Sequence, residues 1–444
     1  MSVNRKSAFF RQSGWLVVAT FTGGAFMALI HPAVSKPMGN DYSSFVALLR
    51  VVMFIGTPFV ALQTIFARQA AAATDANHEQ QLIASSRALL LMTFLVSLVF
   101  AIVVLFDAGP ISRFLKLDNR TALYFTLLVA VTGMGMPIFQ GLLQGTHQFG
   151  GMGWVQITNG FGRLSMMLLF VVIIHGKAAG AMLAVLVSQL VTVSVGGTLT
   201  RRIWTHRPKV SFDWRGWFAS AIPLSFGLAT IQVMQTIDML FVQGLFEKTQ
   251  STLYSGAMMT GFAIVQFIAP VALVMFARVA KSVAHKENSD SVGMTLAATI
   301  IFGCAAGIGC TILPRLPLRL MYFTTPEMWN AAPLVPWYAW ALLPMTVANV
   351  LVQNILAHGR YKAVLWLMLV PFVYAAALCI QAPALVQMPP FHAFVRVIQT
   401  MGIASTVLCA IAAVFSRGRA TANVSDRDSE LAPVISHTAS SPAE

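Results

Sequence analysis

Charged residues are scarce in this sequence. Only 10% of its 444 residues are Asp, Glu, Lys or Arg, whereas 57% are hydrophobic, and the mean hydropathy is +0.73. A soluble domain carries about 25% charged residues, because it needs a polar surface to remain in water. The shortage excludes an ordinary soluble enzyme. A chain of this length has room for about twelve membrane-spanning helices of about 20 residues each.

Cysteines, nucleotide-binding motifs and metal-binding clusters are also few or missing. The four cysteines (Cys304, Cys310, Cys379 and Cys409) lie in apolar runs without metal or disulfide spacing, which favours core packing. The sequence contains no Gly-x-x-x-x-Gly-Lys-Ser/Thr loop, no Ser-centred elbow and no paired carboxylates in an outer loop. We therefore expect no ATP, no metal, no other cofactor and no catalytic residues.

Apolar runs separated by polar or Pro/Gly-rich breaks predict an all-α polytopic membrane protein. They lack the strand alternation of a membrane barrel. The first run, Gly14 to Val34, is too long for a signal-peptide core and precedes no cleavage site, so we expect it to be retained. The twelve predicted spans are 13–34, 45–66, 87–106, 121–143, 154–174, 178–200, 217–242, 255–277, 293–313, 333–355, 363–382 and 395–415.

The basic residues predict the orientation of these spans. Lys and Arg number 29 against 15 acidic residues, a net charge of +14. If both termini are cytoplasmic, 18 basic residues lie on the inner side, 8 in outer loops and 3 within spans. This asymmetry is typical of a cytoplasmic membrane protein with both ends inside. The excess therefore fits cytoplasmic loops, and we expect no nucleic-acid partner.

An internal repeat divides the chain. Tyr42 and Tyr254 open spans 2 and 8 at an offset of 212 residues, and Pro58 and Pro270 share that offset. Six spans precede the basic linker 201–216 and six follow it, so the copies have the same topology and a pseudo-twofold axis along the membrane normal. The predicted parts are an N-terminal half (1–205), a C-terminal half (206–415) and a disordered cytoplasmic tail (416–444).

Several short passages carry a family resemblance. They are Gly39-Asn40-Asp41-Tyr42, Phe66-Ala67-Arg68, Leu142-Leu143-Gln144-Gly145, Ile237-Asp238-Met239-Leu240, Tyr254-Ser255-Gly256-Ala257 and Phe276-Ala277-Arg278. With these passages the chain resembles, over residues 10–415, the polysaccharide (oligosaccharide-lipid) flippases of the multidrug/oligosaccharidyl-lipid/polysaccharide (MOP) flippase superfamily. The resemblance implies two six-helix lobes facing each other across a central cavity, lined mainly by spans 1, 2, 7 and 8. It also implies outward transfer of an undecaprenyl-diphosphate-linked glycan.

Two arginines within spans are candidate ligands for that substrate, because an ionisable side chain inside the bilayer is energetically costly and usually has a functional or structural role. Arg163 follows Gln156 and Asn159 on one face of span 5, and its planar guanidinium suits phosphate oxygens. The alternative is an interhelical contact. Arg50, Thr57 and Thr64 recur every seven residues along span 2, as in a wetted cavity wall. The alternative for Arg50 is snorkelling to the headgroups.

Other polar residues and prolines complete the candidates. Asp238, with Gln235 three residues before it, could bind a coupling ion or pair with an arginine across the lobe interface. The family that the chain resembles often has an acidic residue at this position, which favours the structural role, pairing, over ion coupling. His31 at the end of span 1 fits an interface role better than proton transfer. Pro58 and Pro270 occupy matched positions on two lining spans, so they are candidate hinges or fixed bends.

The sequence thus predicts a flippase in the bacterial cytoplasmic membrane. Its partners would be a lipid-linked anionic glycan, the bilayer and polysaccharide assembly proteins. Alternatives with the same fold are a multidrug/cation antiporter, which would need buried acids that spans 1 and 10 lack, and a lipid II flippase. A polysaccharide polymerase or ligase would need a large outer loop, and a transport-inactive scaffold subunit is a further alternative.

Overall fold

The described part of the chain is helical throughout. The computed structural model describes residues 3–73, 76–205, 210, 214–263, 291–357 and 360–417. The helices of the N-terminal half are α1 (Val3–Met38), α2 (Asp41–Ala72), α3 (Ala76–Phe106), α4 (Ala108–Phe114), α5 (Thr121–Gly133), α6 (Met136–Gly145), α7 (Phe149–Met167, continued by a π-helical stretch, Leu168–Ile173), α8 (Lys177–Leu199) and α9 (Arg201–Thr205). Those of the C-terminal half are α10 (Trp214–Leu245), the helical residues 248–263, α12 (Ser291–Ile312), α13 (Arg315–Met321), a 3₁₀ helix (Pro326–Leu334), α14 (Val335–Ala357), α15 (Lys362–Gln387) and α16 (Pro390–Arg417).

The chain is a multi-pass membrane protein. Ten helices in the described residues are long and apolar enough to cross a membrane, and the bent helix α2 makes eleven. Each corresponds to one of the predicted spans. The twelfth, predicted at 255–277, is described only as far as residue 263. The predicted tail lies outside the described residues from position 418 onward.

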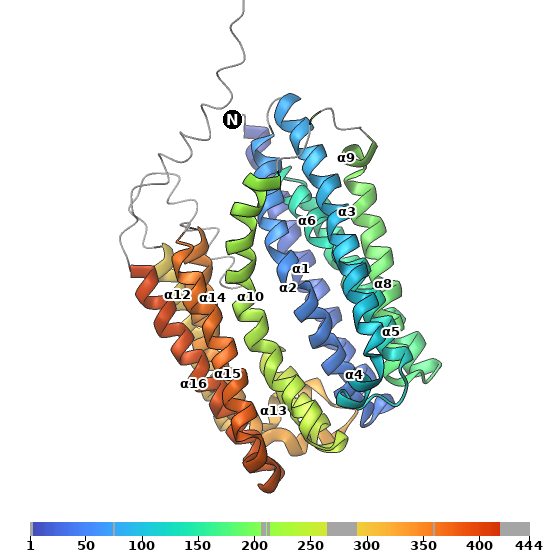
Figure 1. The fold of residues 1–444 in the computed structure, drawn as a ribbon, viewed down its shortest axis with the longest axis vertical. Helices are drawn as coiled ribbons and strands as arrows, with labels where there is room; N and C mark the ends of the chain where they lie inside the picture. Colours follow the sequence, from blue (N-terminus) through green and yellow to red (C-terminus); the bar gives the residue numbers. More distant parts are fainter. Residues whose placement is uncertain are drawn as a thin grey trace, which may run out of the picture.

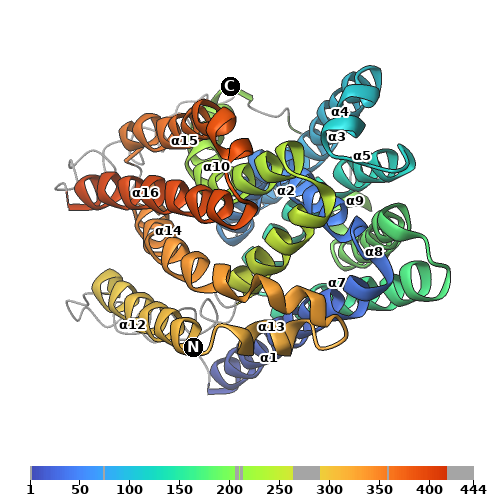
Figure 2. The same ribbon diagram turned by 90° about the horizontal axis from the view of Figure 1, so that it is seen from below.

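The helices form two groups that lie side by side with their axes roughly parallel (Figure 1). In the end-on view of Figure 2, α7 and α8 lie on one side of the molecule and α15 and α16 on the other, with α1, α2, α10 and α14 between them. The outward faces are apolar and exposed: Val99 on α3 is 60% exposed and Ile380 on α15 is 79% exposed. Lipid acyl chains would cover these faces at no desolvation cost.

Glycines bring α1 and α7 into close contact, which fixes the face that α7 turns inward. A Cβ atom on Gly160 would lie 2.4 Å from the carbonyl oxygen of Gly23, so a larger side chain cannot fit there without moving a helix. Nearer the chain's N-terminus the Trp15 and Trp154 rings lie 5.7 Å apart, and Trp15 Nε1 donates to the Gly150 carbonyl at 3.3 Å. Small residues at such crossings are typical of helix packing in membranes.

Helix α2 bends where the sequence places Pro58. The segments Asp41–Thr57 and Ala61–Ala71 meet at 44°. A proline lacks the amide hydrogen that would bond one turn back, and its ring crowds the preceding turn, so a bend here has a local cause. The bend is a fixed feature of this conformation, and the role of Pro58 as a hinge stays a prediction. Pro270 lies outside the described residues.

We predict that Gly160→Leu destabilises the protein. The added side chain overpacks the α1–α7 crossing, at a cost of about 1–3 kcal/mol. Thermal denaturation in detergent should show a lower midpoint than wild type. Gly24→Leu is the control, because a Cβ there meets no atom within 4 Å. Equal midpoints for the two variants would contradict the close approach.

Candidate substrate-binding cavity

A cavity of about 840 Å³ lies between the two halves. It is lined from α1, α2 and α7 on the N-terminal side and from α10, residues 259–263 and α14 on the C-terminal side. Its polar side chains are Thr20, His31, Arg50, Gln156, Asn159, Arg163, Gln232, Gln235, Thr346, Asn349 and Gln353. Among the described lining residues no Asp or Glu occurs. The cavity is therefore cationic and rich in hydrogen-bonding groups.

The two arginines in this lining have no acidic partner within ion-pair distance among the described residues. The guanidinium of Arg163 makes no described hydrogen bond, and its Nε is buried without an acceptor. Arg50 is 3% exposed and also leaves its Nε without an acceptor. Its guanidinium carbon lies 4.0 Å from the ring centroid of Phe262 in the C-terminal half. Arg50 is thus buried and Arg163 partly buried, and a guanidinium in such a place favours a nearby anion, because an unpaired charge away from water is unstable.

Asp238 lies beside the cavity and not in its described lining. It is 1% exposed, and its Oδ2 accepts hydrogen bonds from Tyr254, at 3.0 Å, and from Tyr338. Its Oδ1 is buried without a partner. No ion pair within 4.0 Å joins Asp238 to Arg50 in the described residues, so the pairing of this acid with an arginine across the interface stays a prediction.

The other predicted site residues divide into two groups. Gln235 and Asn159 line the cavity with the arginines, whereas Thr57 and Thr64 do not appear in its described lining. Thr57 is buried and its hydroxyl donates to the carbonyl of Met53 at 2.9 Å. The bend that follows Thr57 ends the seven-residue line along α2, because positions beyond it no longer share one direction.

Sequence reasoning missed the contribution of α14. Thr346, Asn349 and Gln353 are spaced by three and four residues, so they lie on one face of a helix. This polar stripe in an otherwise apolar span was a detectable signal. Span 5 also contributes to the wall, with Gln156, Asn159 and Arg163, beyond the four spans that the family resemblance implied.

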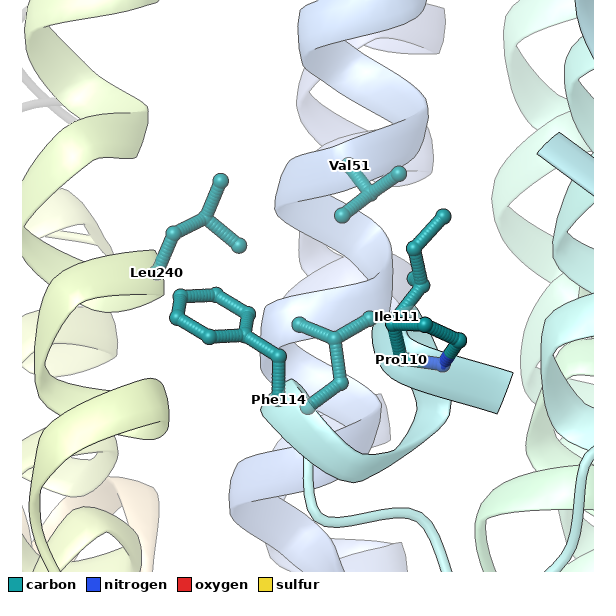
Figure 3. A pocket seen from close by; sticks show the side chains of 6 residues that line it. Val51, Pro110, Ile111, Phe114 and Leu240 are labelled. Carbon is teal, nitrogen blue, oxygen red and sulfur yellow. The ribbon is translucent and has the colours of Figure 1, made fainter. Parts of the chain in front are cut away.

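A second hollow, of about 300 Å³, has a different chemistry. It lies between α2, α4 and α10 and is lined by Val51, Pro110, Ile111, Phe114, Leu115 and Leu240. In Figure 3 the side chains of Phe114 and Leu240 point toward each other across the boundary between the halves. The six described residues that line this hollow are all apolar, in contrast to the polar lining of the larger cavity.

Hydrogen bonds join the two halves at the end of the molecule that carries α4 and α13, here called the closed end (Figure 1). The hydroxyls of Tyr42 and Tyr322 are 2.7 Å apart, and His31 Nδ1 lies 2.8 Å from the same Tyr42 hydroxyl. Gln243 Nε2 donates to the Leu115 carbonyl at 2.8 Å. Because His31 also lines the cavity, this network is the cavity's end wall.

An ion-pair cluster strengthens the closed end. Lys248 of the C-terminal half contacts Asp41 and, at 2.6 Å, Asp118 of the N-terminal half. Burial acts to lower the pKa of Lys248, but hydrogen bonds to Asp118 and Asp41 outweigh it, so the pKa rises above 10.5. The hydrogen bond from Lys248 holds the pKa of Asp118 below 3.8. Lys177 lies 3.8 Å from each of the two aspartates and is 63% exposed.

Comparison with solved structures places this architecture among transporters. An inward-facing multidrug resistance MATE family transporter of the MOP superfamily matches with a TM-score of 0.62 at 11% identity, covering 90% of this chain and 94% of that one. The MATE transporter VcmN of Vibrio cholerae, in its bent form, matches with a TM-score of 0.55 at 12% identity, covering 93% and 98%. A MOP superfamily transporter from Pyrococcus furiosus, described as having a binding pocket of reverse polarity, matches with a TM-score of 0.55 at 12% identity, covering 93% and 95%.

The fold of this chain is thus one that solved membrane transporters of the MOP superfamily share. The sequence model of the polysaccharide biosynthesis protein family matches residues 38–283, which is more than half of the chain. The chain belongs to this family. No curated protein matches it in sequence.

We predict that Lys248→Ala loosens the closed end, because it leaves the buried carboxylate of Asp41 without its nearest cation. The readout is labelling of Met38→Cys by a membrane-impermeant maleimide, in a protein whose four native cysteines are replaced. Met38 is 4% exposed, so the reaction reports opening. Labelling should accelerate clearly in Lys248→Ala and less in Lys177→Ala, whose ammonium is more exposed and more distant.

The same cluster has a defined pH range. Asp118 contributes stability above its unfolded pKa of 3.8 and loses it as the pH falls through its depressed folded value. Lys248 contributes below 10.5 and loses its contribution as the pH rises through its elevated folded value. Between these limits the labelling rate corrected for thiol ionisation should be constant. Equal rates in wild type and Lys248→Ala would overturn the assignment.

Proposed function

We propose that this chain flips a polyprenyl-diphosphate-linked oligosaccharide from the cytoplasmic to the outer leaflet of a bacterial cytoplasmic membrane, by alternating access. One observation carries the proposal: two arginines without an ion-pair partner among the described residues share a cavity with neutral amides and no acid among its described lining residues. A diphosphate supplies the missing negative charge, and sugar hydroxyls match the amides, which both donate and accept hydrogen bonds.

The proposed orientation makes the closed end the outer end. It carries the residues of predicted outer loops, including Lys116, Lys177 and Lys248. In this state the substrate enters from the cytoplasmic side, and the halves then rock to open the other end. Both termini are cytoplasmic in this arrangement. Polysaccharide assembly proteins are the expected downstream partners.

Two other substrates belong to the same fold. The structural neighbours include multidrug transporters, so a multidrug/cation antiporter is the second candidate. An organic cation would meet the repulsion of Arg50 and Arg163 with no acid in the described lining to offset it. Lipid II shares the polyprenyl diphosphate and differs in its glycan, so the charges of the cavity accept it equally. Reconstituted transport of each compound separates the three.

We predict that Arg163→Gln lowers the flipping rate of the lipid-linked oligosaccharide at least tenfold. Loss of a charged hydrogen bond to phosphate costs about 1.5–3 kcal/mol, and 1.4 kcal/mol is a factor of ten. Surface display of glycan in cells, with protein abundance checked, is the measurement. Arg396→Ala is the control, because this arginine is exposed on α16 and does not line the cavity. Normal display in Arg163→Gln would refute its role.

We also predict that membrane voltage drives transport. Moving one elementary charge through 100 mV changes its free energy by about 2.3 kcal/mol, so two negative charges leaving an inside-negative cell gain roughly 4–5 kcal/mol. If the arginines neutralise the substrate fully, the loaded step moves no net charge. The voltage then drives the return step, in which the empty, cationic carrier moves its charge toward the negative inside of the cell. Collapsing the potential in proteoliposomes at constant pH and sodium should slow flipping. An unchanged rate would show that voltage is not the driving force.

A further inference from the structure

The charges of the cavity are divided unequally between its two walls. Both arginines in the described lining, Arg50 and Arg163, belong to the N-terminal half, on α2 and α7. The polar side chains that the described residues of the C-terminal half contribute are neutral: Gln232, Gln235, Thr346, Asn349 and Gln353. A ligand with an anionic and a neutral part therefore meets two different surfaces.

From this division we infer that the cavity holds its substrate in one orientation, with the diphosphate on the N-terminal wall and the glycan on the C-terminal wall. The inference rests on the proposed function and assigns a part of the substrate to each half. A neutral amide cannot replace the charge that a phosphate loses when it leaves water, whereas a guanidinium can. The anionic part therefore binds beside the arginines.

The C-terminal amides are free to bind sugar hydroxyls. The side chains of Gln232 and Gln235 lie one turn apart on α10 and make no described hydrogen bond to protein, so their donors and acceptors are available. On α14, Gln353 Nε2 donates to Asn349 Oδ1 at 3.2 Å, which leaves the other atoms of both amides open. Thr346 and Gln353 are separated by seven residues, or about 10 Å along the axis. The wall is thus long enough to contact more than one sugar ring.

The two walls overlap in depth along the membrane normal. Arg50 lies nine residues from the start of α2 at the closed end, and Gln235 lies ten residues from the end of α10 at the same end. Gln353 lies four residues from the opposite end of α14. A diphosphate beside Arg50 would therefore have amides opposite it on α10, and the stripe of α14 would extend the amide wall toward the cytoplasmic side.

The experiment uses the full chain in proteoliposomes and two fluorescently labelled probes. One is a polyprenyl diphosphate that carries a single N-acetylglucosamine, and the other carries an oligosaccharide of at least four sugars. Gln232→Ala/Gln235→Ala and Asn349→Ala/Gln353→Ala should each lower the flipping rate of the long probe about tenfold, through lost hydrogen bonds. The short probe should change by less than about twofold. Asn159→Ala, an amide on the wall of Arg163, should affect both probes alike.

Further controls separate the possible failures. Thermal melting in detergent shows whether each variant folds, and the conservative variant Gln235→Asn should recover part of the long-probe rate. If the wild-type protein moves neither probe, the proposed function fails. If it moves both, and the C-terminal variants reduce the two rates equally, the two-wall orientation is wrong while the proposed function stands. Loss of only the long probe in Arg163→Gln would also overturn the orientation.

Discussion

Two guanidinium groups in one cavity, those of Arg50 and Arg163, without an acidic partner within ion-pair distance in the described residues, are the constraint on which the cavity depends. Burying one unpaired cation is costly, and two such groups in one chamber repel each other. Helix packing keeps both in place: glycines press α7 against α1, and α2 holds Arg50 over the ring of Phe262. In the proposed function, the anionic group of the substrate supplies the charge that these two arginines lack.

At the closed end, in contrast to the cavity, the charged side chains of the two halves are paired with each other. There Asp41 and Asp118 meet Lys248 directly, so charge is neutralised between the halves and a contact forms. In the cavity the cations are left for the ligand. Ion pairs and hydroxyl contacts, unlike a continuous apolar interface, can exchange protein partners for water when the halves separate. The two halves thus pair their charges with each other at the closed end, whereas the arginines of the cavity have no ion-pair partner among the described residues.

Most of the fold was predictable, since apolar run length alone determines where a helix can cross a bilayer. The candidate site was less so. Arg163 and Asn159 were found because a polar stripe in a span has few structural explanations, and the stripe on α14 carried the same signal. Thr64 was predicted on the assumption of a straight helix, which the 44° bend after Thr57 breaks, and the hydroxyl of the buried Thr57 bonds to its own helix at the Met53 carbonyl. The partners of Asp238, Tyr254 and Tyr338, come from distant segments that no local pattern relates.

Hydrogen bonding connects the cavity to the closed end through His31. His31 lines the cavity, and its ring nitrogen shares a hydrogen bond with Tyr42, whose hydroxyl in turn meets Tyr322 of the other half. A ligand that changes the orientation of the His31 ring therefore changes the partner available to Tyr42. Since Tyr42 and Tyr322 bridge the halves, a chain of hydrogen bonds runs from the cavity lining to the contact between the halves. In the proposed alternating-access cycle the end wall has to respond to the bound substrate, and this chain offers a direct route for that response.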